Sequence, residues 1–254
     1  MTSQVRFVGT SGFYYDVWQG VFYPVGLAKK DRLAHYVKHF NTVELNNPFY
    51  RLPRESTFAG WRDKAPAGFV FSLKASRFIT HIKKLVNVND AVATFFDRAG
   101  HLKEHLGPVL FQLPPTMKRD APLLKNFLSS IPSNCPSVIE FRHPSWYDDA
   151  IYQILAEHKM GFCIHDAVDA PTPVQLTLAD MIYIRFHGPE KGYRGTYGQA
   201  GLYHPAAWVR ETICHHPHIR LFVYFNNTAG GALNDAVMFR DLILIPNRII
   251  PAPR

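Results

Sequence analysis

Residues 138–146, VIEFRHPSW, lie near the middle of the chain and decide the expected fold. The apolar start is typical of a buried strand, yet Glu140 and Arg142 stand two residues apart within it. Because successive side chains of a strand point to opposite faces, these two charged groups share one face. A proline then ends the strand, and we expect Ser145 to cap a helix over 146–158. The stretch therefore predicts a strand, a short turn and a helix, with charge where the strand ends.

The same succession of strand, turn and helix recurs along the chain. We expect strands at 5–9, 42–46, 69–74, 109–113, 138–142, 161–166, 181–188 and 221–227. We expect helices at 28–40, 58–64, 90–106, 122–128, 146–158, 205–215 and 232–244. Between the sixth and seventh strands, prolines leave little room for a helix. Eight strands mostly separated by helices favour an α/β fold, a single TIM-like (β/α)8 barrel with some irregular units, over an open doubly wound sheet.

The size and composition of the chain fit one globular domain. The 254 residues match the roughly 250 residues that are typical of one such barrel. The hydrophobic share of 47% and the charged share of 19% are ordinary for a globular protein. We expect one domain over 1–254, with the proline-containing tail 246–254 extended after the last helix. No glycine-rich dinucleotide or phosphate-binding signature occurs, so we expect no cofactor.

The cysteines and the charge bear on the compartment and the partners. Three cysteines, odd in number and without a CxxC pair, argue against a disulfide framework or a zinc knuckle and favour a reducing compartment. No secretory leader and no long apolar run is present, so we expect a cytoplasmic protein without a membrane partner. The net charge of +8 is dispersed, which makes nucleic acid an alternative partner but not the favoured one. The oligomeric state stays open.

Several short motifs lie at or near the ends of the expected strands. They are Gly9-Thr10-Ser11-Gly12, Thr42-Val43-Glu44-Leu45-Asn46, Lys74 with Arg77, Phe111-Gln112-Leu113-Pro114-Pro115, Glu140 with Arg142-His143, and Phe225-Asn226-Asn227. On these motifs the chain resembles the DUF72 family, also called the YecE-like or TM1631-like proteins. The resemblance implies a TIM-barrel-like fold, in agreement with the strand count. It implies no activity, because a fold alone does not supply one.

The strand pattern predicts where a functional site lies. Alternation brings many polar side chains to the inner face at the C-terminal ends of the strands, where barrel enzymes carry their active sites. We take Glu140 and Glu44 as candidate catalytic acid or base, with His187 or His165 as partner, since near-neutral pKa values suit proton transfer. As candidate substrate-binding residues we take Asn46, Lys74, Arg77, Gln112, Arg142, Asp166, Arg185, Tyr224 and Asn226.

Basic residues in this set indicate the kind of ligand. Lys74, Arg77, Arg142 and Arg185 make the expected mouth electropositive, which suits a phosphate or a carboxylate. The favoured function is therefore an enzyme that binds a small anionic substrate and uses the acid-base chemistry of glutamate and histidine. A glycine-rich loop at 192–201 is expected either to close over this ligand or to be a flexible surface loop.

Three alternatives stay open at this point. A metal-dependent phosphoesterase or nuclease would use Glu44, Glu140, His165, Asp166 and His187 as ligands. No compact ligand motif occurs and the neighbouring cations oppose a metal, so we expect no metal ion. A non-catalytic protein that binds a small molecule is the second alternative. The third is a polar plug, in which ion pairs of Glu140 close the barrel end without chemistry.

Overall fold

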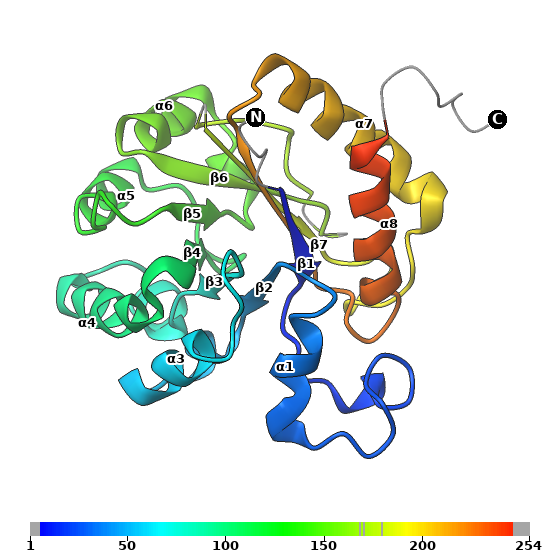
Figure 1. Cartoon of the computed structure of the whole chain (residues 1–254). Helices are drawn as coiled ribbons and strands as arrows, with labels where there is room; N and C mark the ends of the chain where they lie inside the picture. Colours follow the sequence, from blue (N-terminus) through cyan, green and yellow to red (C-terminus); the bar gives the residue numbers. More distant parts are fainter. Residues whose placement is uncertain (1–5, 168, 170, 179, 246–254) are drawn as a thin grey trace.

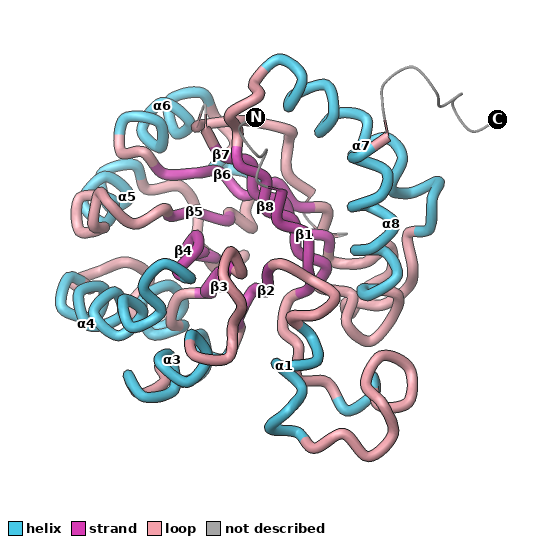
Figure 2. Tube along the Cα trace, viewed as in Figure 1, coloured by secondary structure: helices cyan, strands magenta, loops and turns pink. Residues whose placement is uncertain are grey.

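The computed structural model describes residues 6–245 apart from 168, 170 and 179, and it consists of eight parallel strands with helices around them (Figures 1 and 2). The strands are β1 (Arg6–Thr10), β2 (Thr42–Leu45), β3 (Val70–Lys74), β4 (Leu106–Gln112), β5 (Ser137–Glu140), β6 (Met160–His165), β7 (Met181–Phe186) and β8 (Arg220–Phe225). All eight expected strands are present. The expected tail at 246–254 lies outside the described residues.

The strands follow one another around a nearly closed barrel. Their hydrogen-bonded order is β1-β8-β7-β6-β5-β4-β3-β2, and every pairing is parallel. The seam between β1 and β2 holds a bridge between Ser11 and Glu44, where the Gly12 N–H donates to the Glu44 carbonyl at 2.7 Å. The TIM-like barrel expected from the sequence is therefore confirmed.

Helices cover the outside of the barrel. They are α1 (Arg32–Tyr36), α2 (Asn47–Tyr50), α3 (Glu55–Arg62), α4 (Asn89–Ala99), α5 (Ala121–Leu128), α6 (Asp149–Glu157), α7 (Gly198–His215) and α8 (Ala232–Leu244). Figure 1 shows α3 to α6 along one side and α7 and α8 along the other. The described residues between β6 and β7 contain no helix, as the prolines there predicted. None of the described helices is long and apolar enough to span a lipid bilayer.

The helix after the central stretch begins later than expected. Its N-cap is Asp148, whose Oδ1 accepts from the Ala150 N–H at 2.9 Å, so the prediction of Ser145 as the cap was wrong. Residues 144–146 instead form a single 3-10 turn. This turn buries Trp146 completely and stacks it on Phe141 with ring centroids 4.6 Å apart. Burial of the indole in the core therefore displaced the start of the helix.

Other boundaries also differ from the expectation. The helix expected at 28–40 is a 3-10 turn at Lys29–Asp31 followed by the short α1. The last helix expected before β8 begins at Gly198, so the C-terminal part of the expected glycine-rich loop is helical. The buried Asp235 of α8 accounts for this start, because its carboxylate accepts from the Gly198 N–H at 3.2 Å and satisfies a free donor of the first turn.

The barrel interior is filled in layers. One apolar cluster joins inner-face residues from most strands: Phe7, Leu110, Val138, Cys163, Met181, Tyr183, Phe222 and Tyr224. Tyr224 is fully buried, and its hydroxyl lies 2.7 Å from the hydroxyls of both Thr42 and Ser72. Two residues further along β5, β6 and β7, the inner face carries Glu140, His165 and Arg185. The packed interior therefore forms a solid floor beneath the mouth.

Candidate functional site

A buried ion-pair network crosses the barrel above this floor. Arg185 of β7 lies between Glu44 of β2 and Glu140 of β5, and none of the three side chains is more than 1% exposed. Its Nη2 donates to Glu44 Oε1 at 2.7 Å, its Nε to Glu44 Oε2 at 2.9 Å, and its Nη1 to Glu140 Oε2 at 2.7 Å. Strand alternation correctly placed these three groups on one face.

Both oxygens of the Glu44 carboxylate are occupied by hydrogen bonds. Besides Arg185, it accepts hydrogen bonds from the hydroxyls of Ser11 and Tyr183. Burial alone would raise the pKa of Glu44, but the charge and hydrogen bonds of Arg185 outweigh burial and hold the pKa below its usual value. To act as the expected acid or base, Glu44 would first have to release Arg185. The geometry gives it a positioning role.

Glu140 is paired in the same way. Arg142 donates from Nε to Oε1, and Arg185 holds Oε2. Burial would raise the pKa of Glu140, but the two guanidinium groups hold it well below its usual value. The pairing foreseen for a polar plug is therefore present, and Glu140 orients the two arginines. Its role as a base requires breaking both contacts.

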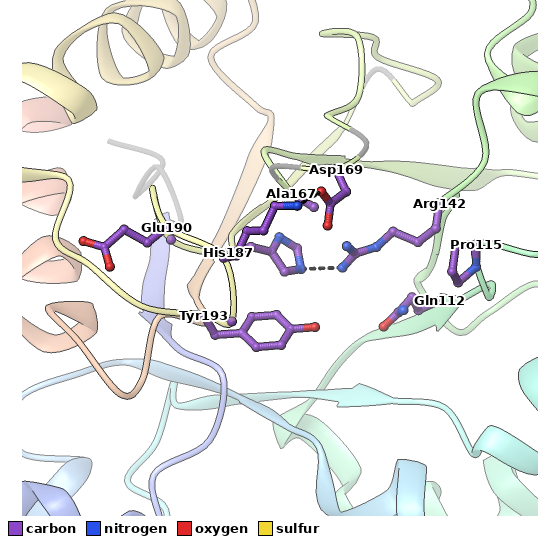
Figure 3. A pocket seen from close by; sticks show the side chains of 11 residues that line it. Gln112, Pro115, Arg142, Ala167, Asp169, His187, Glu190 and Tyr193 are labelled. Atoms are coloured by element: carbon purple, nitrogen blue, oxygen red, sulfur yellow. Dashed lines mark hydrogen bonds and ion pairs between the residues drawn. The ribbon is translucent and has the colours of Figure 1, made fainter.

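His187 receives hydrogen bonds from both arginines. Its Nε2 lies 2.6 Å from Nη2 of Arg142 and 3.2 Å from Nη1 of Arg185, so this nitrogen must be the unprotonated acceptor (Figure 3). The other ring nitrogen is buried without a partner and lies 3.8 Å from Asp166 Oδ1, which is too far for a hydrogen bond. Burial and the nearby Arg185 lower the pKa of His187. The ring is therefore a neutral imidazole.

His165 is engaged at both ring nitrogens. Its Nε2 donates to the Phe141 carbonyl at 2.9 Å, and its Nδ1 accepts from the Ala167 N–H at 3.3 Å. Burial lowers the pKa of His165 to about 4. Neither nitrogen is available for proton transfer, so the structure favours His187 over His165 as the histidine of the site.

Two of the expected ligand-binding residues are engaged in holding the structure. Asp166 accepts from the His187 backbone N–H at 2.7 Å and from the Tyr197 hydroxyl, and it thereby fixes the loop that follows β7. Tyr224 belongs to the floor and has no exposed surface that a ligand could contact. Neither residue lines a cavity at the mouth.

The mouth contains two neighbouring cavities. The smaller, about 380 Å³, is lined by Gln112, Arg142, His187 and residues of the loop after β7. The larger, about 760 Å³, is lined by Asn46, Lys74, Arg185, Asn226 and residues of the loops after β1 and β2. Tyr193 borders both. Figure 3 shows Arg142 and Tyr193 reaching into the smaller cavity from opposite sides.

Several residues in these linings have unused hydrogen-bonding groups. Arg142 donates through Nε and Nη2, but its Nη1 makes no hydrogen bond with any described residue. Asn46 has a buried side-chain oxygen without a partner. Gln112 and Asn226 line the smaller and the larger cavity respectively, whereas the exposed Arg77 lines neither. Most of the expected binding residues are thus brought together, and Arg77 is not.

Among the residues around the cavities that were not selected from the sequence, Phe49 and Tyr193 are the two that the geometry singles out. Phe49 of α2 places its ring under the Lys74 amine, 4.1 Å from the ring centroid. Tyr193 adopts a positive φ of 62° in the loop after β7 and lies between the cavities. The neighbouring glycines were the available signal for Tyr193, because they mark a tightly folded loop. Nothing in the sequence indicated the contact of Phe49.

The described residues contain no group of three or more histidine, cysteine, aspartate or glutamate side chains arranged to hold a metal ion. The oxygens of Glu44 and Glu140 face guanidinium groups instead. A cation at this position would have to displace Arg185. The donor set therefore does not fit the metal-dependent phosphoesterase or nuclease alternative.

Known proteins resemble this chain in sequence and in fold. The chain is 34% identical to the UPF0759 protein YecE of Escherichia coli strain K12 over 116 residues, which cover 45% of this chain and 43% of YecE. It is 27% identical to the UPF0759 protein YunF of Bacillus subtilis strain 168, over 84% of this chain and 86% of YunF. The crystal structure of a DUF72 family protein from Thermotoga maritima, TM1631, has a TM-score of 0.78 at 27% identity and covers 94% of this chain and 99% of its own.

A second solved structure supports the fold alone. The DUF72 family protein EF0366 from Enterococcus faecalis has a TM-score of 0.80 at 19% identity, over 97% of this chain and all of that one. The family model described as a protein of unknown function, DUF72, matches residues 7–253. The resemblance seen in the sequence motifs is therefore confirmed, and the chain belongs to the DUF72 family.

Proposed function

We propose that this chain is an enzyme that binds a small substrate bearing a phosphate or a carboxylate at the mouth of the barrel, with His187 as the group that exchanges a proton. The observation that carries the proposal is the position of Arg142. Its side chain lines the 380 Å³ cavity, is held by Glu140 through Nε, and has a free Nη1. A planar guanidinium held at one edge presents the other edge to an anion in a bidentate geometry.

Anion binding and proton transfer are coupled through the same guanidinium. In the empty site the Nη2 of Arg142 donates to His187 Nε2. An anion that accepts from both Nη1 and Nη2 draws the guanidinium away from the imidazole, which weakens this hydrogen bond, and adds a negative charge beside the ring. Both changes raise the pKa of His187, since an opposite charge favours the protonated ring. Substrate binding thus makes His187 a stronger base, and the longer contact from Arg185 Nη1 at 3.2 Å is the remaining donor that an incoming proton displaces.

Glu44 and Glu140 contribute by holding the arginines. The proposal departs here from the sequence-based expectation that these carboxylates are the acid and the base. Each of them has a lowered pKa and is paired with buried guanidinium groups. Their charges offset those of Arg185 and Arg142, which lets two arginines lie side by side at low solvent exposure.

Calorimetric titration with inorganic phosphate tests the binding step. The parent chain and Arg220→Met are expected to bind phosphate alike, because Arg220 begins β8 at the opposite end of the barrel and pairs with Asp180. Arg142→Met is expected to lose at least tenfold in affinity, about 1.4 kcal/mol or more for a charge-assisted contact. Equal affinity in all three proteins would refute the assignment of Arg142.

Titration of the His187 ring by NMR tests the proton-transfer step. Phosphate is expected to raise the pKa of His187 in the parent chain and to leave it unchanged in Arg142→Met. His187→Asn is expected to retain phosphate binding and to lose turnover of any substrate found. Phosphate binding with no change at His187 would favour the non-catalytic alternative, a protein that binds a small molecule.

A further inference from the structure

Lys74 differs from the charged residues of the buried network, Glu44, Glu140, Arg142 and Arg185, in having no charged partner among the described residues. Its amine makes no hydrogen bond or ion pair with any described residue, although it ends β3 inside the barrel wall. The carboxylates that face the same space, Glu44 and Glu140, are engaged by Arg185 and Arg142. A partly buried ammonium without a counter-ion is costly, so this position lowers the preference of the amine for its charged form.

The surroundings orient the amine toward open space. The Lys74 Nζ lies over the face of the Phe49 ring, 4.1 Å from its centroid, and the same side chain lines the 760 Å³ cavity. The electron-rich face of the ring attracts the N–H groups of the amine and fixes its position, and the lone pair of the neutral amine is not engaged by the ring. Burial and the charge of Arg185 lower the pKa of Lys74 to about 8. About a tenth of the amine is therefore unprotonated at pH 7, far more than for an ordinary lysine with a pKa near 10.4.

We propose that Lys74 is the nucleophile of this site and forms an imine with the carbonyl carbon of an anionic aldehyde or keto acid. The proposal rests on the proposed function and names its substrate class. Lysines that are desolvated or lie beside another cation are the ones that proteins use for this chemistry. Asn46 and Asn226 line the same cavity: the unpaired side-chain oxygen of Asn46 can accept from the hydroxyl of the carbinolamine, and the amide group of Asn226 can donate to the carbonyl oxygen.

The covalent step is balanced without any further reactant. The Nζ lone pair attacks the carbonyl carbon, a carbon–nitrogen bond forms, and the carbonyl electron pair moves to oxygen. A proton from Nζ and one from solvent in the open cavity convert this oxygen into water, which leaves. The product is a protonated imine plus one water molecule, and hydrolysis restores the amine.

The two cavities allow one molecule to use both groups. Arg142 lines the smaller cavity and Lys74 the larger, and Tyr193 borders both. The positive charges of Arg185 and Arg142 also act on Lys74. These cations attract the anionic end of a substrate to the mouth, and its carbonyl end is thereby brought near Lys74.

Reductive trapping tests the proposal. The full chain is incubated with glyoxylate, which carries a carbonyl and a carboxylate, and with cyanoborohydride at pH 7.5. Intact mass and peptide mapping then locate the reduced adduct. Among the lysines we expect the adduct on Lys74, with a preference on the order of tenfold or more over ordinary lysines, because these have far less free amine at this pH; peptide mapping distinguishes it from reaction at the α-amino group, whose pKa is similar. Lys118→Met, which removes an exposed lysine, is expected to react like the parent, and Lys74→Met to lose this adduct.

The outcomes separate imine formation from anion binding. Adducts spread evenly over surface lysines, or an unmodified Lys74, would overturn the nucleophile assignment. If Lys74 stays unmodified while phosphate still binds through Arg142, the proposed function stands and the imine role fails. Propanal, which lacks the anionic group, is expected to modify Lys74 more slowly than glyoxylate. Equal rates would contradict a shared anionic substrate.

Discussion

Replacement of Glu140 by glutamine tests the ion-pair network at its centre. The substitution keeps the volume of the side chain but removes the charge that offsets Arg142 and Arg185. It also turns an amide N–H₂ toward a guanidinium donor. Breaking a buried pair by removing one partner costs about 3–5 kcal/mol, because a buried charge is left uncompensated. For a chain of this size about 1 kcal/mol corresponds to roughly 2–4 °C, so we expect a fall of roughly 10 °C in melting temperature.

Equilibrium unfolding in urea provides the magnitude and the control. Glu211→Gln removes an exposed carboxylate on α7 and is expected to change the free energy of unfolding by less than about 0.5 kcal/mol.

The stabilisation from Glu140 should depend on pH in one direction. Because the folded pKa of Glu140 is depressed, its contribution is present above the unfolded value near 4.3 and is lost as the pH falls toward the folded value. The difference between the parent and Glu140→Gln should therefore shrink below about pH 4. A loss of stability no larger than that of Glu211→Gln would refute the buried network.

Two further substitutions are expected to change the free energy of unfolding in opposite directions. Lys74→Met is expected to be more stable than the parent at pH 7, by up to about 3 kcal/mol, since each unit of pKa shift is worth about 1.4 kcal/mol. The folded pKa of about 8 lies below the ordinary 10.5, so the free energy of unfolding of the parent should rise with pH between these two values. The stability advantage of Lys74→Met should therefore become smaller over the same range. Urea unfolding at several pH values would detect this change. Tyr224→Phe removes the hydroxyl that bonds Thr42 and Ser72, and a loss of about 1–3 kcal/mol is expected in the same assay. Phosphate affinity should be unchanged by Tyr224→Phe, because this residue lies in the floor beneath the cavities. A weakened affinity would show that Tyr224 contributes to ligand binding.

The sequence predicted the barrel because each strand carries an unambiguous signal. In β7, Tyr183 and Arg185 share the inner face and apolar residues alternate with them, so period and direction were both readable. The first residues of the helices were harder to predict from the sequence. Asp148 and Ser145 are both good caps by residue type, and the choice between them depended on the burial of Trp146 against Phe141, a tertiary contact that no local pattern encodes.

The membership of the site was also predictable, but the roles within it were not. Alternation placed Glu44, Glu140 and Arg185 at one mouth, as found. Whether a carboxylate remains unpaired depends on distances across the barrel. In this structure Glu44 and Glu140 both form ion pairs with the guanidinium of Arg185. Lys74 has no charged partner because these two carboxylates are already paired with arginines. Sequence patterns give the face of a strand but not the partner on the opposite strand.

Anomalous diffraction from crystals soaked in tungstate, a tetrahedral anion like phosphate, tests anion recognition by Arg142 most directly. We predict a tungstate peak within hydrogen-bonding distance of the Arg142 Nη1, inside the cavity that Gln112 and His187 line, with Nη2 turned from His187 toward the anion. Tungstate bound only at exposed lysines such as Lys29 and Lys30, with the mouth of the barrel empty and the contact between Arg142 and His187 intact, would contradict it.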